Sequence, residues 1–346
     1  MLAYTYLGRE RGGLTDKAEP VIMKDTDAIV RVTLASICTS DLHILHGSVP
    51  RAVPGITLGH EAVGIVQRVG AAVKKVRPGD RVSVNVETFC GECFFCGRGY
   101  VNNCTLPDGG WAMGCTIDGM QAELVRVPHA DTGLTVIPEG VSDAGAVLAG
   151  DILATGWWAA KIADIEEGSD VLIIGAGPTG ICCALAARLK SPKRVFICDI
   201  DEMRLDFVRK HYLSLIPLHA RDVLAAMRSE CAHGGADGVI EAAGTAESFR
   251  LAWEAARPNA TVTVVAMYDE PQILPLPEMY GKNLTFKTGG VDGCDAADIL
   301  ACIAEGRLNT APLITHTFPL SRAEEAYEFF AAKADGVMKV ALDCTR

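Results

Sequence analysis

Four cysteines with metal-ligand spacing lie within fifteen residues, CGECFFCGRGYVNNC, from position 90 to 104. Cys90, Cys93, Cys96 and Cys104 follow the pattern C-x2-C-x2-C-x7-C. Short loops of this kind let four thiolates converge on one tetrahedral zinc, which then has no position left for water or substrate. The pattern therefore favours a closed, structural zinc. An iron–sulfur cluster and a redox dithiol are alternatives, although neither explains the polar turn stretch GRGYVNN.

A second set of possible ligands is dispersed along the chain. SICTSDLHILHG and PGITLGHEAVGIVQRVG together offer Cys38, Ser40, Asp41, His43, His46, His60 and Glu61. One such residue alone in a β domain is usually packed or solvated. Because thiolate, imidazole and carboxylate are the donors that zinc prefers, the combination indicates a second metal site, where we expect the chemistry to occur.

A glycine-rich turn marks a third site. GAGPTG places Gly175, Gly177 and Gly180 in G-x-G-x-x-G spacing, between the strand-like VLIIG and an apolar helical stretch. The first glycine permits the sharp bend, the second lets a pyrophosphate approach the backbone, and the third lets the helix lie close to the strand. Pro178 suits the first helical turn, where no amide donor is lost. An ordinary tight turn between strand and helix is the alternative.

Asp199 strengthens the prediction of a bound dinucleotide. It ends the next strand-like segment, VFICD, nineteen residues after Gly180. A carboxylate there can accept both ribose hydroxyls of adenosine and would repel a 2′-phosphate, so the sequence favours NAD over NADP. Arg204 acts in the opposite direction because a guanidinium can hold a phosphate.

The segments that carry these residues show two different patterns of residue types. Up to about residue 150, β-branched runs broken by glycine and proline, such as AIVRVTLAS and RPGDRVSVNV, predict an irregular β-rich domain. From SDVLIIGAGPTG onward, apolar strands alternate with helical stretches such as DEMRLDFVRKH. This alternation predicts an α/β domain with a doubly wound parallel sheet of the Rossmann type. After about residue 287 the sequence pattern is mixed again, and it ends in the strand-like VMKVALDC.

Composition limits the class of protein. The chain has 346 residues, 49% hydrophobic and 22% charged, which suits two globular domains. Acidic residues outnumber basic ones 43 to 32 and no Lys/Arg-rich run occurs, which argues against nucleic acid or a membrane surface as a partner. The first residues lack a signal-peptide pattern, and thirteen cysteines in such a chain favour reduced thiols. We expect a cytoplasmic protein.

One segment carries a family signature. GHEAVGIVQRVGAAV, from 59 to 73, fits G-H-E-x2-G-x5-G-x2-V at every fixed position. With CTSDLH, RPGDRV, the four cysteines, GAGPTG and the closing KVAL, the chain resembles the zinc-containing medium-chain alcohol dehydrogenases over essentially its whole length. The resemblance implies a GroES-like catalytic domain formed by 1–152 and 288–346, with a structural zinc lobe at 88–106, and a Rossmann cofactor domain at 153–287.

The same resemblance implies a catalytic zinc, the second of two per chain, held by Cys38, His60 and Asp151. Many relatives have a cysteine in the third place, whereas LAGDILATG puts Asp151 there, as in a microbial secondary-alcohol branch. Three protein ligands leave a fourth position for water or alcohol. Glu61 is the alternative ligand, and Asp41 would orient the His60 ring.

Three further residues receive roles from the resemblance. Ser40 corresponds to the hydroxyl that bonds the substrate oxygen, and His43 to the solvent-side end of a proton relay through the cofactor ribose. A surface histidine is the alternative for His43. Lys339, in GVMKVAL, lies where relatives place a basic residue near the cofactor pyrophosphate, unless it is an exposed lysine at the end of a strand.

Trp111 bears on the substrate. It opens GWAMGCTIDGMQAE and resembles a tryptophan that lines the cleft of the secondary-alcohol branch, although buried packing is the commoner fate of a tryptophan. With Asp151 and CTSDLH it favours a small-molecule substrate, a secondary alcohol or ketone, that exchanges hydride with NAD at the zinc. The best-known members of that branch lack the four-cysteine lobe and prefer NADP, so primary alcohols, polyols and bulkier compounds such as hydroxysteroids stay open.

Three other classes compete with this interpretation. A non-catalytic zinc-binding module does not explain the glycine turn with Asp199. A thiol-based redox sensor would use Cys182 and Cys183, which fit better as small core residues of a helix. A zinc-free quinone reductase of the same superfamily should lack Cys38 and His60. Because relatives assemble through their cofactor domains, we expect a homo-oligomer, a tetramer rather than a dimer.

Overall fold

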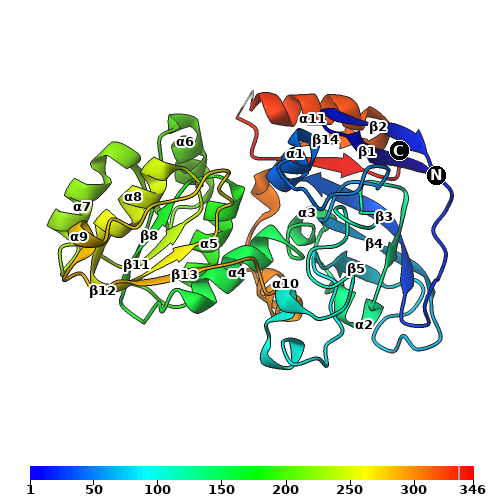
Figure 1. The fold of residues 1–346 in the computed structure, drawn as a ribbon, viewed down its shortest axis with the longest axis horizontal. Coiled ribbons are helices and arrows are strands. Elements are labelled where there is room, and N and C mark those ends of the chain that lie inside the picture. Colours follow the sequence, from blue (N-terminus) through cyan, green and yellow to red (C-terminus); the bar gives the residue numbers. More distant parts are fainter. Residues whose placement is uncertain (334–335) are drawn as a thin grey trace. The chain divides into compact units, whose positions relative to one another are not determined.

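The computed structural model describes residues 1–333 and 336–346, which divide into two compact units (Figure 1). The first unit joins Met1–Ala154 to Asp292–Arg346, and the second is the continuous segment Thr155–Val291. Each unit has its own core of buried apolar side chains. The chain therefore leaves the first unit and later returns to complete it.

The first unit is rich in antiparallel strands. Within the described residues its main sheet has seven strands, in the order β14-β15-β3-β4-β5-β7, with β6 also paired to β3. Their bounds are β3 (Ala28–Ile37), β4 (Ala62–Val69), β5 (Arg81–Val84), β6 (Leu124–Val127), β7 (Leu134–Val136), β14 (Ile314–Pro319) and β15 (Lys339–Asp343). A separate antiparallel pair joins β1 (Leu2–Gly8) to β2 (Arg11–Asp16). The helices are α1 (Thr39–His46), α2 (Ala130–Gly133), α3 (Asp143–Ala146), α10 (Ala296–Ala304) and α11 (Ala323–Ala332).

The second unit is a parallel sheet with helices. Its six described strands lie in the order β10-β9-β8-β11-β12-β13, and every pairing is parallel. The strands are β8 (Asp170–Ile174), β9 (Arg194–Asp199), β10 (Ile216–His219), β11 (Ala236–Glu241), β12 (Ala256–Val264) and β13 (Thr285–Thr288). The helices are α4 (Ile152–Ile162), which leads in from the first unit, α5 (Pro178–Arg188), α6 (Glu202–His211), α7 (Val223–Glu230), α8 (Ala246–Ala255) and α9 (Leu276–Met279). The order reverses between β8 and β11, which is the switch point where such sheets bind ligands.

Local sequence explains these elements. Every residue of the central strand β8 is buried, as expected where helices cover both faces of a parallel sheet. Helix α8 begins after Thr245, whose hydroxyl accepts the N–H of Ser248, and helix α6 begins after Asp201, whose carboxylate accepts the N–H of Met203. The predicted fold class, a β-rich GroES-like domain with a Rossmann domain, is confirmed. Among the described residues no helix is long and apolar enough to cross a membrane.

Candidate active site

Cys38 lies at the junction of β3 and α1. It is the residue before the first turn of α1, and its main-chain N–H donates to Asp41 Oδ2 at 2.9 Å. Asp41 is fully buried, so its carboxylate closes the start of the helix from inside the unit. The sharp change from strand to helix leaves the Cys38 thiol beside Ser40, with 3.8 Å between Sγ and Oγ.

His60 and Asp151 meet Cys38 from two other segments. His60 precedes β4, and Asp151 immediately precedes α4. His60 Nε2 lies 3.3 Å from Asp151 Oδ2, and one donor atom from each of the three residues lies within 4.8 Å of the others. The three side chains are buried, so they converge in a site with little access to bulk water.

This trio fits a zinc ion. A tetrahedral zinc with bonds of about 2.0 to 2.3 Å separates its ligand atoms by about 3.3 to 3.8 Å. The Nε2–Oδ2 distance of 3.3 Å falls in that range. His60 Nδ1 lies 3.1 Å from Asp41 Oδ1, which leaves Nε2 directed toward Asp151. The chemistry of the donors, thiolate, imidazole and carboxylate, also suits this metal.

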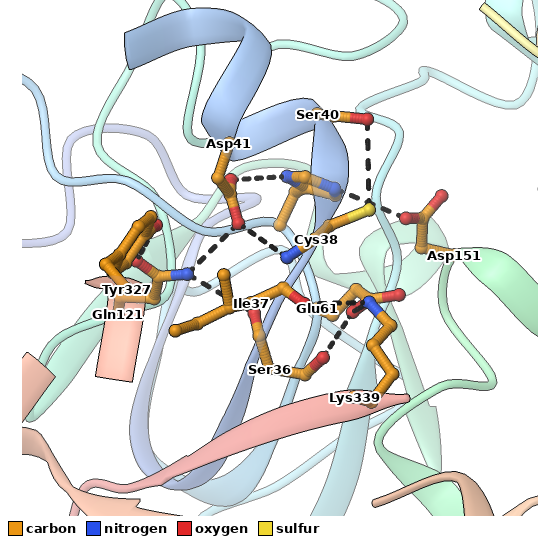
Figure 2. Close-up of polar contacts among 11 residues, drawn as sticks. Ser36, Ile37, Cys38, Ser40, Asp41, Glu61, Gln121, Asp151, Tyr327 and Lys339 are labelled. Atoms are coloured by element: carbon orange, nitrogen blue, oxygen red, sulfur yellow. Dashed lines mark hydrogen bonds and ion pairs between the residues drawn. The ribbon is translucent and has the colours of Figure 1, made fainter. Parts of the chain in front are cut away.

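Glu61 is held by a different partner. Its Oε2 accepts the Ser36 hydroxyl at 2.6 Å and forms a buried ion pair with Lys339, the first residue of β15 (Figure 2). Lys339 Nζ also donates to the Ile37 carbonyl at 3.1 Å. Burial alone would lower the pKa of Lys339, but the negative charges of Cys38 and Glu61 raise it above its ordinary value. The ammonium therefore stays charged beside Glu61, whose other oxygen, Oε1, has no hydrogen-bond partner among the described residues.

Lys339 is the residue whose surroundings differ most from expectation. The alternative of an exposed lysine at the end of a strand is wrong, because only 2% of Lys339 is exposed. A lysine in a strand can be buried when an opposite charge inside the fold pairs with it. Glu61 supplies that charge. Its contact with a cofactor pyrophosphate stays a prediction.

The remaining candidates are Trp111, which contacts His60, and two histidines of α1. The Trp111 ring meets the His60 ring edge-on, with centroids 5.3 Å apart, and its Nε1 is buried without a hydrogen-bond partner in the described part of the chain. His43 is half-buried in the last turn of α1, whereas His46 is exposed. Trp111 is thus close enough to shape space near the metal ligands.

The four-cysteine lobe is a second group of residues that could hold a metal ion. The sulfurs of Cys90, Cys93, Cys96 and Cys104 all lie within 4.8 Å of one another. Main-chain N–H groups of Cys96 and Thr105 lower the pKa of Cys93 to about 5, which favours the thiolate that binds metal. Besides the cysteines, the apolar cluster of the lobe contains only Phe89, Val101 and Leu106 among the described residues. So small a core fits a loop held together by a metal.

The glycine turn has the geometry that a pyrophosphate requires. A Cβ on Gly180 would lie 1.8 Å from the Gly175 carbonyl oxygen, and one on Gly175, where φ is +101°, would meet the backbone of Ala242 at 3.1 Å. Gly177 precedes α5, which begins at Pro178, so the free N–H groups of the first turn follow the bend. A side chain is therefore excluded at Gly175 and Gly180, where one part of the backbone lies close to another.

Asp199 and Arg204 border this turn. Asp199 Oδ2 accepts the N–H of Ala176 at 2.8 Å, and Arg204 Nη1 lies 3.4 Å from the same oxygen. A Cβ on Gly177 would lie 3.7 Å from Arg204 Nη1. The carboxylate and the guanidinium therefore lie together beside the glycine turn.

Two pairs of residues at these sites were not found from the sequence. Gln121 and Tyr327 continue the contacts of Asp41 into the first unit, with 2.7 Å between the Tyr327 hydroxyl and Gln121 Oε1. In the second unit Glu241, at the end of β11, accepts the N–H groups of Ala243 and Gly244 and the Tyr268 hydroxyl. Gln121 between the apolar Met120 and Ala122 was a weak signal for the first pair. Glu241, a carboxylate at the end of an apolar strand, was a weak signal for the second.

A Rossmann-type unit joined to a β-rich unit with a metal-ligand trio is the architecture of the medium-chain dehydrogenases. Residues 24–139 match the family model described as an alcohol dehydrogenase GroES-like domain, and residues 178–298 match the zinc-binding dehydrogenase model. An alcohol dehydrogenase of Cupriavidus necator is 32% identical over 99% of this chain and 98% of its own length. An NADP-dependent isopropanol dehydrogenase of Thermoanaerobacter brockii is 28% identical over 98% of each chain. The structure of an alcohol dehydrogenase from Thermus sp. ATN1 superposes with a TM-score of 0.91 at 34% identity, over 99% of both chains.

The chain belongs to the zinc-dependent medium-chain alcohol dehydrogenase family. It is an oxidoreductase that acts on small-molecule alcohols with zinc and a nicotinamide cofactor. The predicted family, enzyme class and general reaction are confirmed.

Proposed function

We propose that the chain interconverts secondary alcohols and ketones with NAD, at a catalytic zinc held by Cys38, His60 and Asp151. The observation that carries this proposal is the buried convergence of these three donors. A bound zinc would supply a Lewis acid that lowers the pKa of the substrate hydroxyl. A second zinc, in the four-cysteine lobe, would be structural. Glu61 is the less favoured ligand because Lys339 already neutralises it.

The proton released by the alcohol needs a route out of the buried site. Ser40, beside the Cys38 sulfur, offers a hydroxyl that can accept this proton from the substrate oxygen and donate its own onward. His43, half-buried one turn later in α1, would pass it to solvent. Replacing His43 with glutamine should lower turnover and change its pH dependence; an unchanged profile would remove His43 from the relay.

Two features support the choice of substrate and cofactor. Asp199 presents a carboxylate that attracts ribose hydroxyls and repels a 2′-phosphate, which favours NAD. Asp151 as third ligand and Trp111 beside His60 favour secondary alcohols, and the isopropanol dehydrogenase relative acts, by its name, on such an alcohol. That relative uses NADP, and Arg204 is the residue of this chain that would allow it.

The same proposal includes a homo-oligomer, a tetramer rather than a dimer, in the cytoplasm. Ile273, Leu276 and Tyr280, near the edge strand β13, are 81%, 68% and 93% exposed. An apolar edge of this kind suits association of cofactor units. Sedimentation of the purified protein would give the number of chains.

Initial rates with matched primary and secondary alcohols, each with NAD and NADP, test the proposal. We expect faster oxidation of secondary alcohols, a preference for NAD, and loss of activity on chelation. Metal analysis should give two zinc ions per chain, and one in Cys38→Ser or Asp151→Ala, with NADH binding retained. The control is Cys302→Ser, because Cys302 is a buried cysteine of α10 that belongs to neither group of proposed zinc ligands. Activity on primary alcohols or polyols alone would change the substrate class, and retained zinc in Asp151→Ala would change the ligand set.

A further inference from the structure

A row of buried polar side chains extends from His60 to the C-terminal helix α11. His60 contacts Asp41. Asp41 in turn contacts Gln121, and Gln121 contacts Tyr327 (Figure 2). Asp41 and Gln121 are fully buried and Tyr327 is 4% exposed. Polar groups at such depth are costly unless each has a partner, so this arrangement calls for a physical role.

The contacts define an order of donors and acceptors. The Tyr327 hydroxyl donates to Gln121 Oε1 at 2.7 Å. Gln121 Nε2 donates to Asp41 Oδ2 at 3.2 Å and to the Ser36 carbonyl at 3.3 Å. Asp41 Oδ2 also accepts the N–H of Cys38, while Oδ1 lies 3.1 Å from His60 Nδ1. Asp41 Oδ2 thus accepts hydrogen bonds from Gln121 and Cys38, while Oδ1 faces His60.

This order selects one orientation of the Gln121 amide. An ionised carboxylate only accepts hydrogen bonds, so the NH2 group must face Asp41 and the carbonyl must face a donor. Tyr327 is that donor. Burial and the negative charge of Asp41 raise the pKa of Tyr327 well above its ordinary value, so its hydroxyl keeps its proton. A flipped amide would set a carbonyl against the carboxylate.

The backbone holds Gln121 firmly in this place. The N–H of Gln121 donates to the Leu58 carbonyl, and that of Met120 to the Gly59 carbonyl, both at 2.9 Å. A Cβ on Gly59 would lie 2.4 Å from Gln121 Cγ, where φ of Gly59 is +90°. The glycine before His60 is therefore required by the side chain of Gln121 as well as by the turn.

We propose that Gln121 and Tyr327 are positioning residues for the zinc ligand His60. They hold the Asp41 carboxylate in the rotamer that places Oδ1 at His60 Nδ1, which fixes the ring with Nε2 toward the metal. The inference rests on the proposed catalytic zinc, and it adds two residues from segments far from the ligands in sequence. Loss of such outer contacts typically costs about 10- to 100-fold in metal affinity.

The test uses the full-length protein with both metals bound. Tyr327→Phe removes one hydroxyl, and Gln121→Met replaces the amide at similar length. The matched control is Tyr4→Phe, because Tyr4 is equally buried and stacks on Tyr327 with ring centroids 4.3 Å apart. The rate of zinc transfer to an excess of chelator is followed for each protein, and the visible spectrum of the cobalt-substituted catalytic site is recorded.

Tyr327→Phe and Gln121→Met should release the catalytic zinc about 10- to 100-fold faster than wild type and alter the cobalt spectrum, while the lobe zinc and Tyr4→Phe stay unchanged. Release and spectra equal to wild type would overturn the inference, even if thermal stability falls. Equal effects in Tyr4→Phe would overturn it as well, because the cause would be packing. If Gln121→Met unfolded and lost both zinc ions, the zinc release rate and cobalt spectrum of Tyr327→Phe would test the inference instead. A wild-type protein with lobe zinc alone would instead overturn the proposed catalytic site, and the inference with it.

Discussion

Asp199 Oδ2 accepts a hydrogen bond from the main-chain N–H of Ala176 at 2.8 Å, so the carboxylate that ends β9 is tied to the glycine turn that follows β8. Its Oδ1 accepts the N–H of Asp201 at 3.0 Å. The carboxylate is therefore oriented before any cofactor arrives. An orientation fixed in advance reduces the entropy lost on binding.

Substitution of Asp199 should change the cofactor preference. Asp199→Asn keeps an acceptor for the Ala176 N–H but removes the charge that repels a 2′-phosphate. We expect NADH to bind about 10-fold more weakly, equivalent to about 1.4 kcal/mol, and the ratio of kcat/KM for NAD over NADP to fall. Fluorescence titration with NADH and rates with both cofactors measure these effects. Asp206→Asn, on the exposed face of α6, is the control, and an unchanged ratio would argue against a role for Asp199 in selectivity.

The ion pair between Lys339 and Glu61 should contribute strongly to stability. Lys339→Met leaves the Glu61 carboxylate buried without its opposite charge, which typically costs about 3 to 5 kcal/mol. Urea unfolding of the zinc-loaded protein measures the free energy of unfolding. The double variant Lys339→Met with Glu61→Gln should recover part of the loss, because no charge is then left unpaired. A loss below about 1 kcal/mol in the single variant would mean that Glu61 is not left as a buried unpaired charge, because it takes up a proton or is reached by water.

Glu87 should make stability depend on pH. Burial raises the pKa of its carboxyl from 4.5 to about 8, although its Oε2 accepts the N–H of Gly293 at 2.7 Å. Between these two values the folded protein keeps a proton that the unfolded chain has released. The unfolded state then binds fewer protons, so the free energy of unfolding falls as pH rises through this window, by on the order of 1 kcal/mol per unit.

Glu87→Gln should remove that decline, because the amide has no charged form. Unfolding by urea at several pH values between 5 and 8 would show a flatter profile for this variant than for wild type. Glu139→Gln, at an exposed glutamate, should leave the wild-type slope unchanged. Parallel profiles for wild type and Glu87→Gln would assign the pH dependence to other groups.

The four-cysteine lobe should unfold locally without its metal. Cys104→Ser removes one thiolate from a segment whose apolar cluster is small. We expect one zinc per chain to remain and proteolysis within residues 88–106 to become at least about 10-fold faster, since open populations follow local stability. NADH binding by the second unit should be unaffected. Proteolysis at the wild-type rate would show that the lobe is held by its other contacts.

Local patterns were sufficient for part of the site. The cysteine spacing and the glycine turn are each contained in one short segment, and both geometries were predicted from residue types alone. Asp151 is distant from Cys38 and His60 in the sequence, so its place in the trio came from the family resemblance. Side-chain periodicity does not encode which distant residues meet, because that depends on how strands align in the sheet.

The contacts that sequence analysis missed illustrate this limit. Lys339 and Glu61 are 278 residues apart in sequence, and Tyr327 and Gln121 are 206 apart. A lysine at the start of a strand and a tyrosine on a helix each suit a surface position as well as a buried one. Lys339 reaches Glu61 only when β15 lies beside β3, and Tyr327 reaches Gln121 only when α11 is in place. Buried polar pairs of this kind are therefore the features that required a three-dimensional structure.

The pairing of β15 with β3 also constrains how the protein can be made. The ribosome synthesises β15 after the whole of the second unit, so Leu34–Ile37 of β3 has no partner on that edge while the second unit emerges and folds. Over the same interval Glu61 lacks the charge of Lys339. An unpaired strand edge is a site for association with other chains. The Leu34–Ile37 edge of β3 is therefore open to such association until β15 has been synthesised and pairs with it.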